Sequence, residues 1–201
     1  MSVTSTAAPR GPIHRGERAR ARVLRAALEV LADRGMTGFT IEAVANRAGA
    51  SKATVYRRWP SRGALLVDAM DWSFQPLPTP ATGELRADLV ELMAGMEALF
   101  GGQPFPRLMA AFIDAAERDP TLSSLHVELT ARRREPVLHV LAEAVRRGDI
   151  PPTADLDLAV DMLAGPGFYR RFIAHRPIPE GYTTALVDCV LAAIGAPRMG
   201  G

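Results

Sequence analysis

Apolar residues in the first third of the chain recur at helical spacing, in four blocks that glycine, proline and hydroxyl residues separate. The first block begins near Arg15 and carries one apolar stripe that ends at Gly35, a residue suited to a left-handed helix cap. Thr40, Ser51 and Ser61 each precede a later block, where a side-chain oxygen can accept a hydrogen bond from the first backbone N–H groups of a helix. The pattern predicts helices over residues 15–35, 41–48, 52–59 and 62–74.

A proline- and glycine-rich stretch, "QPLPTPATG" at 75–83, separates these blocks from longer apolar stripes with a 3.6-residue period. Pro136 is expected to kink one of the later helices, and Gly165-Pro166-Gly167 is expected to break or kink another, because proline removes a backbone hydrogen bond. No stretch alternates with a period of two, so the chain is predicted to be all-α with about nine helices. The later helices are predicted over 85–100, 108–116, 121–147, 153–175 and 181–195.

Basic residues are in excess in the first part of the chain and acidic residues in the second. Residues 1–62 contain 12 Lys and Arg against 4 acidic residues, while the remainder contains 12 against 18. A solvated charged surface would explain single arginines but not this regional asymmetry. A basic N-terminal third therefore suggests a polyanionic partner such as nucleic acid.

Several classes of function lack support in the sequence. The apolar runs fall far short of the roughly 20 residues that span a bilayer, and the N-terminal segment has no signal-peptide core, so we expect a cytoplasmic protein. The single cysteine, Cys189, is expected to be a small buried hydrophobe rather than a nucleophile. We find no metal-ligand cluster, paired carboxylates, activated nucleophile or phosphate loop, and we expect no metal, no cofactor and no enzyme activity.

Two short predicted helices joined at Gly49 match the helix-turn-helix pattern, in which the second helix enters the major groove of DNA. The second helix begins with the small residues Ala50, Ser51 and Ala53, which allow its N-terminus to approach the DNA closely. Unpaired N–H groups at that N-terminus favour a phosphate.

The residues that follow suit different kinds of contact. Thr54 can reach a base edge or a thymine methyl group, and Arg57 is the natural reader of guanine. Tyr56 can hydrogen-bond a phosphate, and Arg58 adds positive charge at the helix end. Val55 is expected to point inward and fix the crossing of the two helices.

The run "FTIEAVANRAGASKATVYRRWPSRGALLVDAM" resembles the DNA-binding domain of the TetR family of bacterial regulators, and residues 15–73 fit that pattern. The resemblance implies phosphate contacts from the start of the first short helix, a buried aromatic at Trp59, and a backbone-neutralising cation just inside the next helix. The DNA-contacting residues that it implies, together with those suggested above, are Thr40, Ser51, Lys52, Ala53, Thr54, Tyr56, Arg57, Arg58 and Arg62.

The resemblance also implies a domain organisation: a disordered arm at 1–14, a DNA-binding domain at 15–74, and a ligand-binding and dimerisation domain at 75–201. Family members form homodimers through their last two helices, here about 155–174 and 180–195. Apolar residues in these helices suit either the dimer interface or the core of one protomer; they are Leu158, Met162, Phe172, Leu186, Val190 and Ile194.

Methionine and aromatic residues in the acidic part suit a pocket for an apolar small molecule, although ordinary core packing is the favoured explanation for each residue taken singly. The candidates are Met93, Met96, Phe100, Phe105, Met109, Phe112, Met162, Phe168 and Tyr169. His126 and His139 could also bond a ligand, although a satisfied or exposed histidine is the favoured explanation for each.

These observations predict a homodimeric DNA-binding transcriptional regulator, a repressor that a small apolar effector releases from a palindromic operator in double-stranded DNA. The alternative is a DNA-binding regulator whose C-terminal domain only dimerises or binds a protein partner. A cavity among the candidate residues would distinguish the first from the second.

Overall fold

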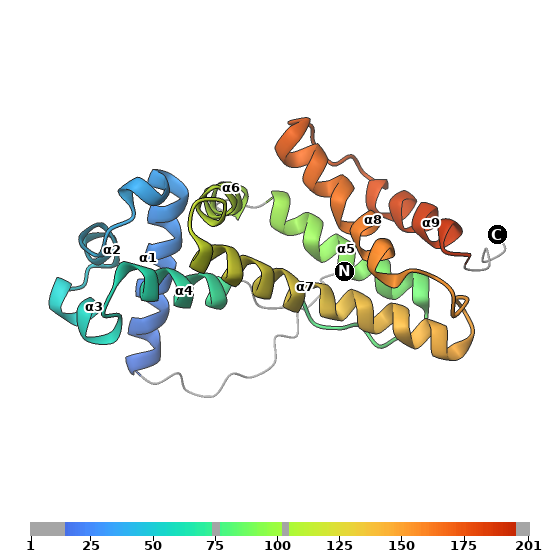
Figure 1. Ribbon diagram of the computed structural model, residues 1–201, viewed down its shortest axis with the longest axis horizontal. Coiled ribbons are helices and arrows are strands. Elements are labelled where there is room, and N and C mark those ends of the chain that lie inside the picture. Colours follow the sequence, from blue (N-terminus) through green and yellow to red (C-terminus); the bar gives the residue numbers. More distant parts are fainter. Residues whose placement is uncertain (1–14, 74–76, 102–104, 196–201) are drawn as a thin grey trace, which may run out of the picture.

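The computed structural model describes residues 15–73, 77–101 and 105–195, and the regular elements in these ranges are all helical (Figure 1). The all-α prediction is confirmed. The predicted N-terminal arm at 1–14 lies outside the described residues, as do residues 75 and 76 of the proline-rich stretch. The α-helices are α1 (Arg15–Gly38), α2 (Ile41–Ala48), α3 (Lys52–Arg58), α4 (Arg62–Ser73), α5 (Leu85–Gly101), α6 (Phe105–Ala116), α7 (Pro120–Arg147), α8 (Leu156–Phe168) and α9 (Tyr182–Ala193).

The predicted caps define the short N-terminal helices. Thr40, Ser51 and Ser61 each accept a hydrogen bond from the backbone N–H three residues on, at 3.1, 3.2 and 3.1 Å. Gly49 ends α2 in the left-handed conformation (φ 59°, ψ 39°), which costs glycine little because it has no Cβ. These local interactions fix the turn between α2 and α3.

Several predicted helix limits differ from the structure, those of α1 and α7 among them. Helix α1 is interrupted at Gly35 (φ 60°, ψ −170°), as predicted, but helical geometry resumes for a further turn that ends at Gly38. Helix α7 begins at Pro120, with Asp119 as its cap, and is one helix of 28 residues through the buried Pro136. The prediction of one helix that contains Pro136 and ends before Gly148 is therefore confirmed.

The sequence predicts a break or a kink at Gly165-Pro166-Gly167, and the break does not occur at these residues. Helix α8 continues through Pro166 to Phe168, and only then does the chain widen into a π-helical turn, Tyr169–Ile173. Gly165 has no Cβ to clash with the following proline ring, which lets the helical conformation pass this point. The wide turn closes with a hydrogen bond from the N–H of Ala174 to the carbonyl of Tyr169, at 2.8 Å.

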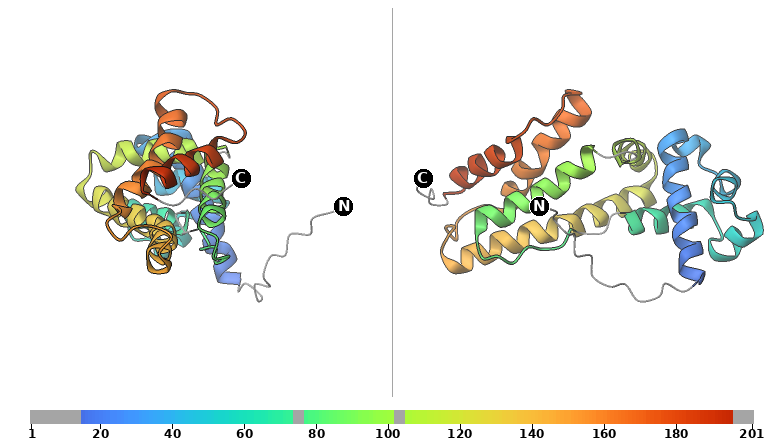
Figure 2. Two further views of the ribbon diagram at one scale, coloured as in Figure 1. Left: turned by 90° about the vertical axis from the view of Figure 1, so that its right-hand side faces the viewer. Right: turned by 180° about the vertical axis from the view of Figure 1, so that it is seen from behind.

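Buried residues form two clusters. The first core joins α1, α2, α3 and α4 to α6 and to residues 122–129 of α7. The second core joins α5, residues 137–144 of α7, α8 and α9. Figures 1 and 2 show α7 running from the group of N-terminal helices to the far end of the molecule, so that this one helix contributes to both cores.

Cys189 is exposed on α9, so the expectation of a buried cysteine is wrong. Its neighbours Val187 and Val190 occupy the buried face of α9, at 0% and 1% exposure, and Cys189 falls on the other side of the helix. Within the described ranges, no helix is long and apolar enough to span a membrane. The same ranges contain no group of three or more His, Cys, Asp and Glu residues that could hold a metal ion.

Candidate nucleic-acid interface and effector cavity

Helix α3 lies on the surface with one residue anchored in the first core. Val55 is fully buried, as are Val44 of α2 and Leu31 of α1 in the same cluster. This burial fixes how α3 lies on α1 and α2 and turns its other side chains outward. The predicted DNA-contacting residues are all exposed; they are Thr40, Ser51, Lys52, Ala53, Thr54, Tyr56, Arg57, Arg58 and Arg62.

Trp59 follows the last residue of α3 and connects this helix, through Asp68, to α4 and α1. Its side chain is 4% exposed, and its indole Nε1 donates a hydrogen bond to Asp68 Oδ2 of α4 at 2.8 Å. Arg20 of α1 donates to the same carboxylate through Nε, at 3.3 Å, and through its terminal nitrogen. The sequence predicted the buried aromatic but not its partners. A buried indole N–H requires an acceptor, and this requirement is the signal that could have led to Asp68.

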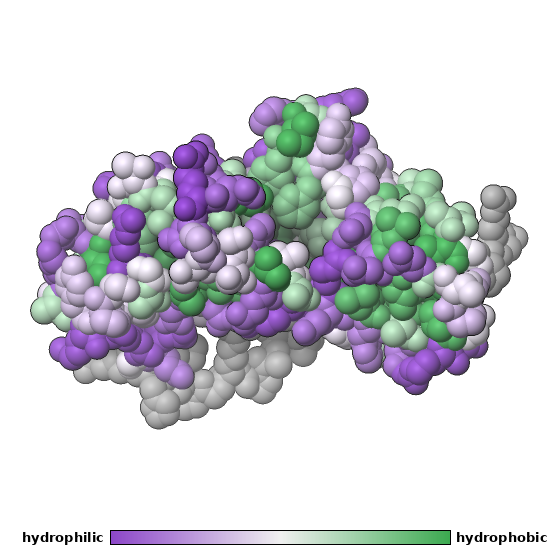
Figure 3. Space-filling model, in the orientation of Figure 1, coloured by the Kyte–Doolittle hydropathy of each residue, from purple (hydrophilic) through white to green (hydrophobic). Residues whose placement is uncertain are grey.

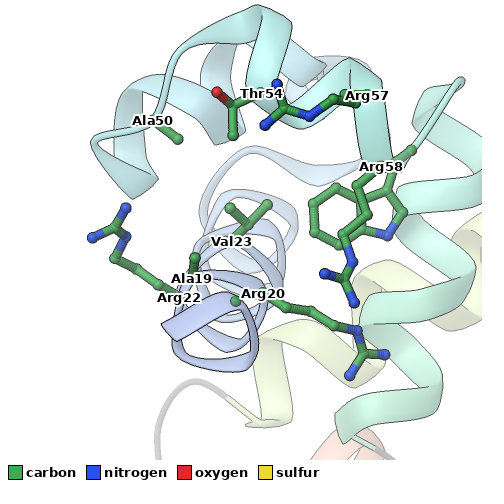
Figure 4. Close-up of a pocket in the computed structure, with 10 residues that line it drawn as sticks. Ala19, Arg20, Arg22, Val23, Ala50, Thr54, Arg57 and Arg58 are labelled. Carbon is green, nitrogen blue, oxygen red and sulfur yellow. The ribbon is translucent and has the colours of Figure 1, made fainter. Parts of the chain in front are cut away.

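A cleft of about 290 Å³ separates α3 from the N-terminal half of α1 (Figure 4). In Figure 4, Thr54 and Arg57 of α3 lie across the cleft from Arg22 and Val23 of α1. Four arginines line the cleft in all, namely Arg20, Arg22, Arg57 and Arg58. Sequence reasoning missed the contribution of α1, although Arg18, Arg22 and Arg25 recur there at helical spacing. The concave surface beside α3 is therefore positively charged.

Lys52, one of the predicted DNA contacts, is paired with an acid in this structure. Its Nζ donates to Glu42 Oε1 of α2, and this hydrogen bond raises the pKa of Lys52. Both side chains are more than half exposed, so the pair is worth little and can exchange for another anion. By contrast, within the described residues no carboxylate pairs with Arg57, Arg58 or Arg62.

A cavity of about 100 Å³ lies among α5, α6, α7 and α8. It exceeds several-fold the roughly 10–15 Å³ that one water molecule requires. Five of the predicted effector-contacting residues line it, namely Met93, Met96, Phe100, Met109 and Phe168.

The other four predicted residues are not among those that line this cavity. Tyr169 is 60% exposed, and Phe112 is fully buried in the first core. Met162 packs against the second core, and the ring of Phe105 lies 6.1 Å from that of Phe100, centroid to centroid. Their helical spacing could not distinguish a cavity wall from close packing.

One wall of the cavity is polar and comes from a single helix. His126, Thr130, Arg133 and Arg134 of α7 line it, at spacings that place them on one helix face. The sequence analysis considered His126 but neither arginine. The detectable signal was a run of three arginines, 132–134, in the interval between the apolar residues Leu129 and Val137.

The three consecutive arginines of α7 contact three different parts of the structure. Arg132 pairs with Asp71 of α4, and this hydrogen bond raises its pKa. The next residue, Arg133, lines the cavity with its Cζ 5.3 Å from the centroid of the Phe105 ring. Arg134 pairs with two acids of α8 at positions 157 and 161, which raise its pKa. This segment therefore links the cavity wall to α4 and to α8.

The predicted dimer residues divide between surface and core. Leu158 is 54% exposed on α8, and Tyr169 and Ile173 of the following π-helical turn are 60% and 69% exposed. Figure 3 shows apolar surface over the part of the molecule that α8 and α9 form. Val190, however, is 1% exposed and belongs to the second core of its own protomer. The remaining predicted residues, Met162, Phe172, Leu186 and Ile194, are half-buried.

A helix-turn-helix unit with an exposed basic helix, joined to a helical bundle with a cavity, defines a class of DNA-binding regulators. Residues 23–69 match the family described as bacterial regulatory proteins, tetR family, and residues 79–190 match the tetracyclin repressor-like C-terminal domain. The chain belongs to the TetR family, and it is a DNA-binding transcriptional regulator, as the sequence predicted.

Relatives of similar length support this assignment. The chain is 34% identical over 171 residues to Rv1556 of Mycobacterium tuberculosis, an uncharacterized HTH-type transcriptional regulator, with 84% of each chain covered. It is also 34% identical over 189 residues to the DNA-binding transcriptional repressor TetR of Mycobacteroides abscessus, with 92% and 98% covered. The solved structure of the TetR family transcription regulator SCO0332 is 34% identical, with a TM-score of 0.66 over 89% of this chain and 99% of that one.

Proposed function

We propose that the protein is a homodimeric repressor that a small effector releases from a palindromic operator. In this proposal, residues 15–74 form the DNA-binding domain and residues 75–201 the effector-binding and dimerisation domain. The relative from Mycobacteroides abscessus is a repressor, which supports repression rather than activation. The protein acts in the cytoplasm, where bacterial DNA lies, and without a catalytic step.

The exposed side of α3 enters the major groove in this proposal. Arg57 and Thr54 read bases, while Tyr56, Thr40 and Arg62 hold the phosphate backbone. The arginine-lined cleft beside α3 supports this placement, because its positive charge attracts the negatively charged DNA backbone. One module of this size buries little surface, so a two-fold dimer that reads two half-sites supplies the affinity that a regulator needs.

Dimerisation uses α8 and α9. The exposed apolar side chains of Leu158, Tyr169 and Ile173 support this placement, because large apolar groups gathered on a surface mark interaction sites. Val190 is not part of the proposed interface.

The observation that carries the effector proposal is the position of Met109. This residue of α6 lines the cavity and also belongs to the first core, in which α6 packs with α1. A ligand in the cavity can therefore shift α6 against the helices that hold α3. It weakens DNA binding only if it prefers the conformation in which the two recognition helices of the dimer are wrongly spaced.

The ion pair between Arg132 and Asp71 supports a second connection between the cavity wall and α4. The cavity and its two connections to the N-terminal helices, through Met109 and through Arg132, favour an effector-responsive regulator. They do not favour a regulator whose C-terminal domain only dimerises or binds a protein. A densely packed bundle would have favoured the latter.

A band-shift titration with DNA from the protein's own promoter region tests the proposal. We expect one dimer to bind one palindrome, and a compound that occupies the cavity to lower the affinity. Equal affinity for promoter and unrelated DNA would contradict specific repression. Unchanged affinity when the cavity is demonstrably occupied would contradict effector control.

A further inference from the structure

Positive charge lies on both walls of the cleft between α3 and α1. Thr54, Arg57 and Arg58 line the α3 wall, and Arg20 and Arg22 line the α1 wall. In Figure 4, Arg22 and Arg58 lie at opposite ends of the cleft. No acidic residue is among the described residues that line it, so the cleft suits a partner that carries negative charge at more than one point.

Arg22 is the cation of the α1 wall that no acid neutralises. Its side chain is exposed, and it forms no ion pair with the described residues, whereas Arg20 is bonded to an acid of α4. The acids on the same face of α1, Glu29 and Asp33, lie roughly two and three turns further along the helix. Arg47 of α2 pairs with both of them, at 3.2 and 3.0 Å. The charge of Arg22 is therefore left for a partner outside the chain.

The rest of the lining is apolar, and most of it is small. Gly16, Ala19 and Val23 of α1 line the cleft with Ala50, which lies in the turn before α3. Such groups let another molecule approach α1 closely and suit the sugar edge of a nucleic acid strand. A single small anion would meet only one end of a cleft of about 290 Å³, whereas a strand carries a phosphate at every step and can meet both ends.

The position of the cleft beside α3 identifies which part of the DNA it faces. A helix that lies in the major groove has one strand of the duplex on each side, so the surface next to α3 meets sugar and phosphate rather than base edges. The cleft opens on the side of α3 that faces α1 (Figure 4). A strand on that side meets α1 as well as α3.

We propose that one strand of the operator lies in this cleft, with one phosphate bound by Arg22 of α1 and another bound by Arg58 of α3. This inference rests on the proposed operator binding and adds α1 to it, because the contacts predicted from the sequence all fall between residues 40 and 62. Arg22 contributes to affinity and to the orientation of the protein on DNA but not to base preference, since phosphates carry no sequence information.

Arg22→Gln removes the proposed contact from the α1 wall. Fluorescence anisotropy measures binding of the full chain to a promoter fragment and to an unrelated duplex of equal length, over a series of salt concentrations. We expect the slope of log K against log salt to become shallower by about 0.9 for each bound protomer on both duplexes, with the preference among single-base variants unchanged. Arg22→Lys should restore most of the slope, because a phosphate requires a charge rather than a planar fork.

Ala19→Leu tests the cleft itself without a change of charge. Ala19 is exposed and lines the cleft, so a leucine there occupies the space assigned to the strand and should reduce the slope as Arg22→Gln does. Arg146→Gln and Ala142→Leu are the matched controls, because both residues are exposed near the end of α7 that is remote from α3 (Figure 1). Both controls should leave the slope unchanged, and retained helical circular dichroism shows that each variant is folded.

Several results would overturn the inference: an unchanged slope in Arg22→Gln, an equal reduction in Arg146→Gln, or undiminished binding by Ala19→Leu. A changed base preference in Arg22→Gln would do so as well, because it would place this side chain on a base edge. The proposed repression fails separately, if the wild type binds both duplexes with equal affinity. The slopes still test the cleft in that case, since phosphate contacts do not depend on sequence.

Discussion

The indole Nε1 of Trp59 donates a hydrogen bond to Asp68 Oδ2 at 2.8 Å, across the junction between α3 and α4. Because Arg20 of α1 binds the same carboxylate, one acid of α4 holds together α1, α3 and α4. The carboxylate of Asp68 thus adds to the burial of Val55 in holding the orientation of α3.

Replacement of Asp68 by alanine should destabilise the fold by about 1–3 kcal/mol, since it leaves the buried indole N–H without an acceptor and Arg20 without its partner. Urea unfolding measures the loss. Asp114→Ala removes an exposed carboxylate paired with Arg118 and should cost no more than about 0.5 kcal/mol. Similar losses for the two variants would contradict the role assigned to Asp68.

The helices and caps of the DNA-binding part could be predicted because they depend on neighbours in sequence. Thr40, Ser51 and Ser61 bond to backbone groups three residues away, and Gly49 supplies a conformation that its own lack of a Cβ permits. The bond between Arg20 and Asp68 spans 48 positions, so no local pattern reveals it.

The cavity could be predicted only in part for the same reason. Apolar spacing identified the helix faces that bear Met93 and Phe168 but could not separate them from Phe112, which packs in the first core. The arginines of α7 interrupt an apolar stripe, and their separate partners on α4 and α8 depend on tertiary contacts that the sequence does not show.

Arg57 should determine base preference, whereas Tyr56 should contribute to binding of any DNA. Arg57→Ala is expected to lose about 1–3 kcal/mol of discrimination at one or two bases, and Tyr56→Phe to weaken binding to all sequences alike. Fluorescence anisotropy with an operator and single-base variants, at one salt concentration, measures both. If both variants retained affinity and specificity, α3 would not be the recognition helix.

Glu42 should restrain DNA binding, because its carboxylate holds the Nζ of Lys52. Glu42→Gln frees the lysine for a phosphate, so affinity for non-specific DNA should rise and the slope of log K against log salt should steepen by up to about 0.9. Glu117→Gln, at an exposed site just beyond α6, also removes one negative charge and should have a smaller effect. Equal changes for the two variants would indicate a general charge effect.

Leu158 should contribute to the dimer interface. Leu158→Glu places a charge on the apolar surface of α8, and we expect the sedimentation coefficient to shift toward that of a monomer while the helical circular dichroism is retained. Val127→Glu is the matched control, because Val127 is 69% exposed on α7. A Leu158→Glu protein that remains dimeric at micromolar concentration would place the interface elsewhere.

Gly167 should set the shape of the cavity among α5, α6, α7 and α8. A Cβ added there would lie 3.0 Å from Cε2 of Phe100, a residue that lines the cavity. That ring packs edge to face with the rings of Phe168 and Phe172, at 5.0 and 6.0 Å, so it cannot move without disturbing both.

Gly167→Ala should therefore displace Phe100 and weaken several-fold the binding of a small molecule that occupies the cavity, and this disturbance should offset the roughly 0.5–1 kcal/mol that alanine normally adds over glycine in a helix. Gly101→Ala on α5 is the control, because its added Cβ would meet nothing within 4 Å. Calorimetric titration and thermal unfolding of both variants measure the two effects. If Gly167→Ala matched Gly101→Ala in affinity and in melting temperature, the contact with Phe100 would have no bearing on the cavity.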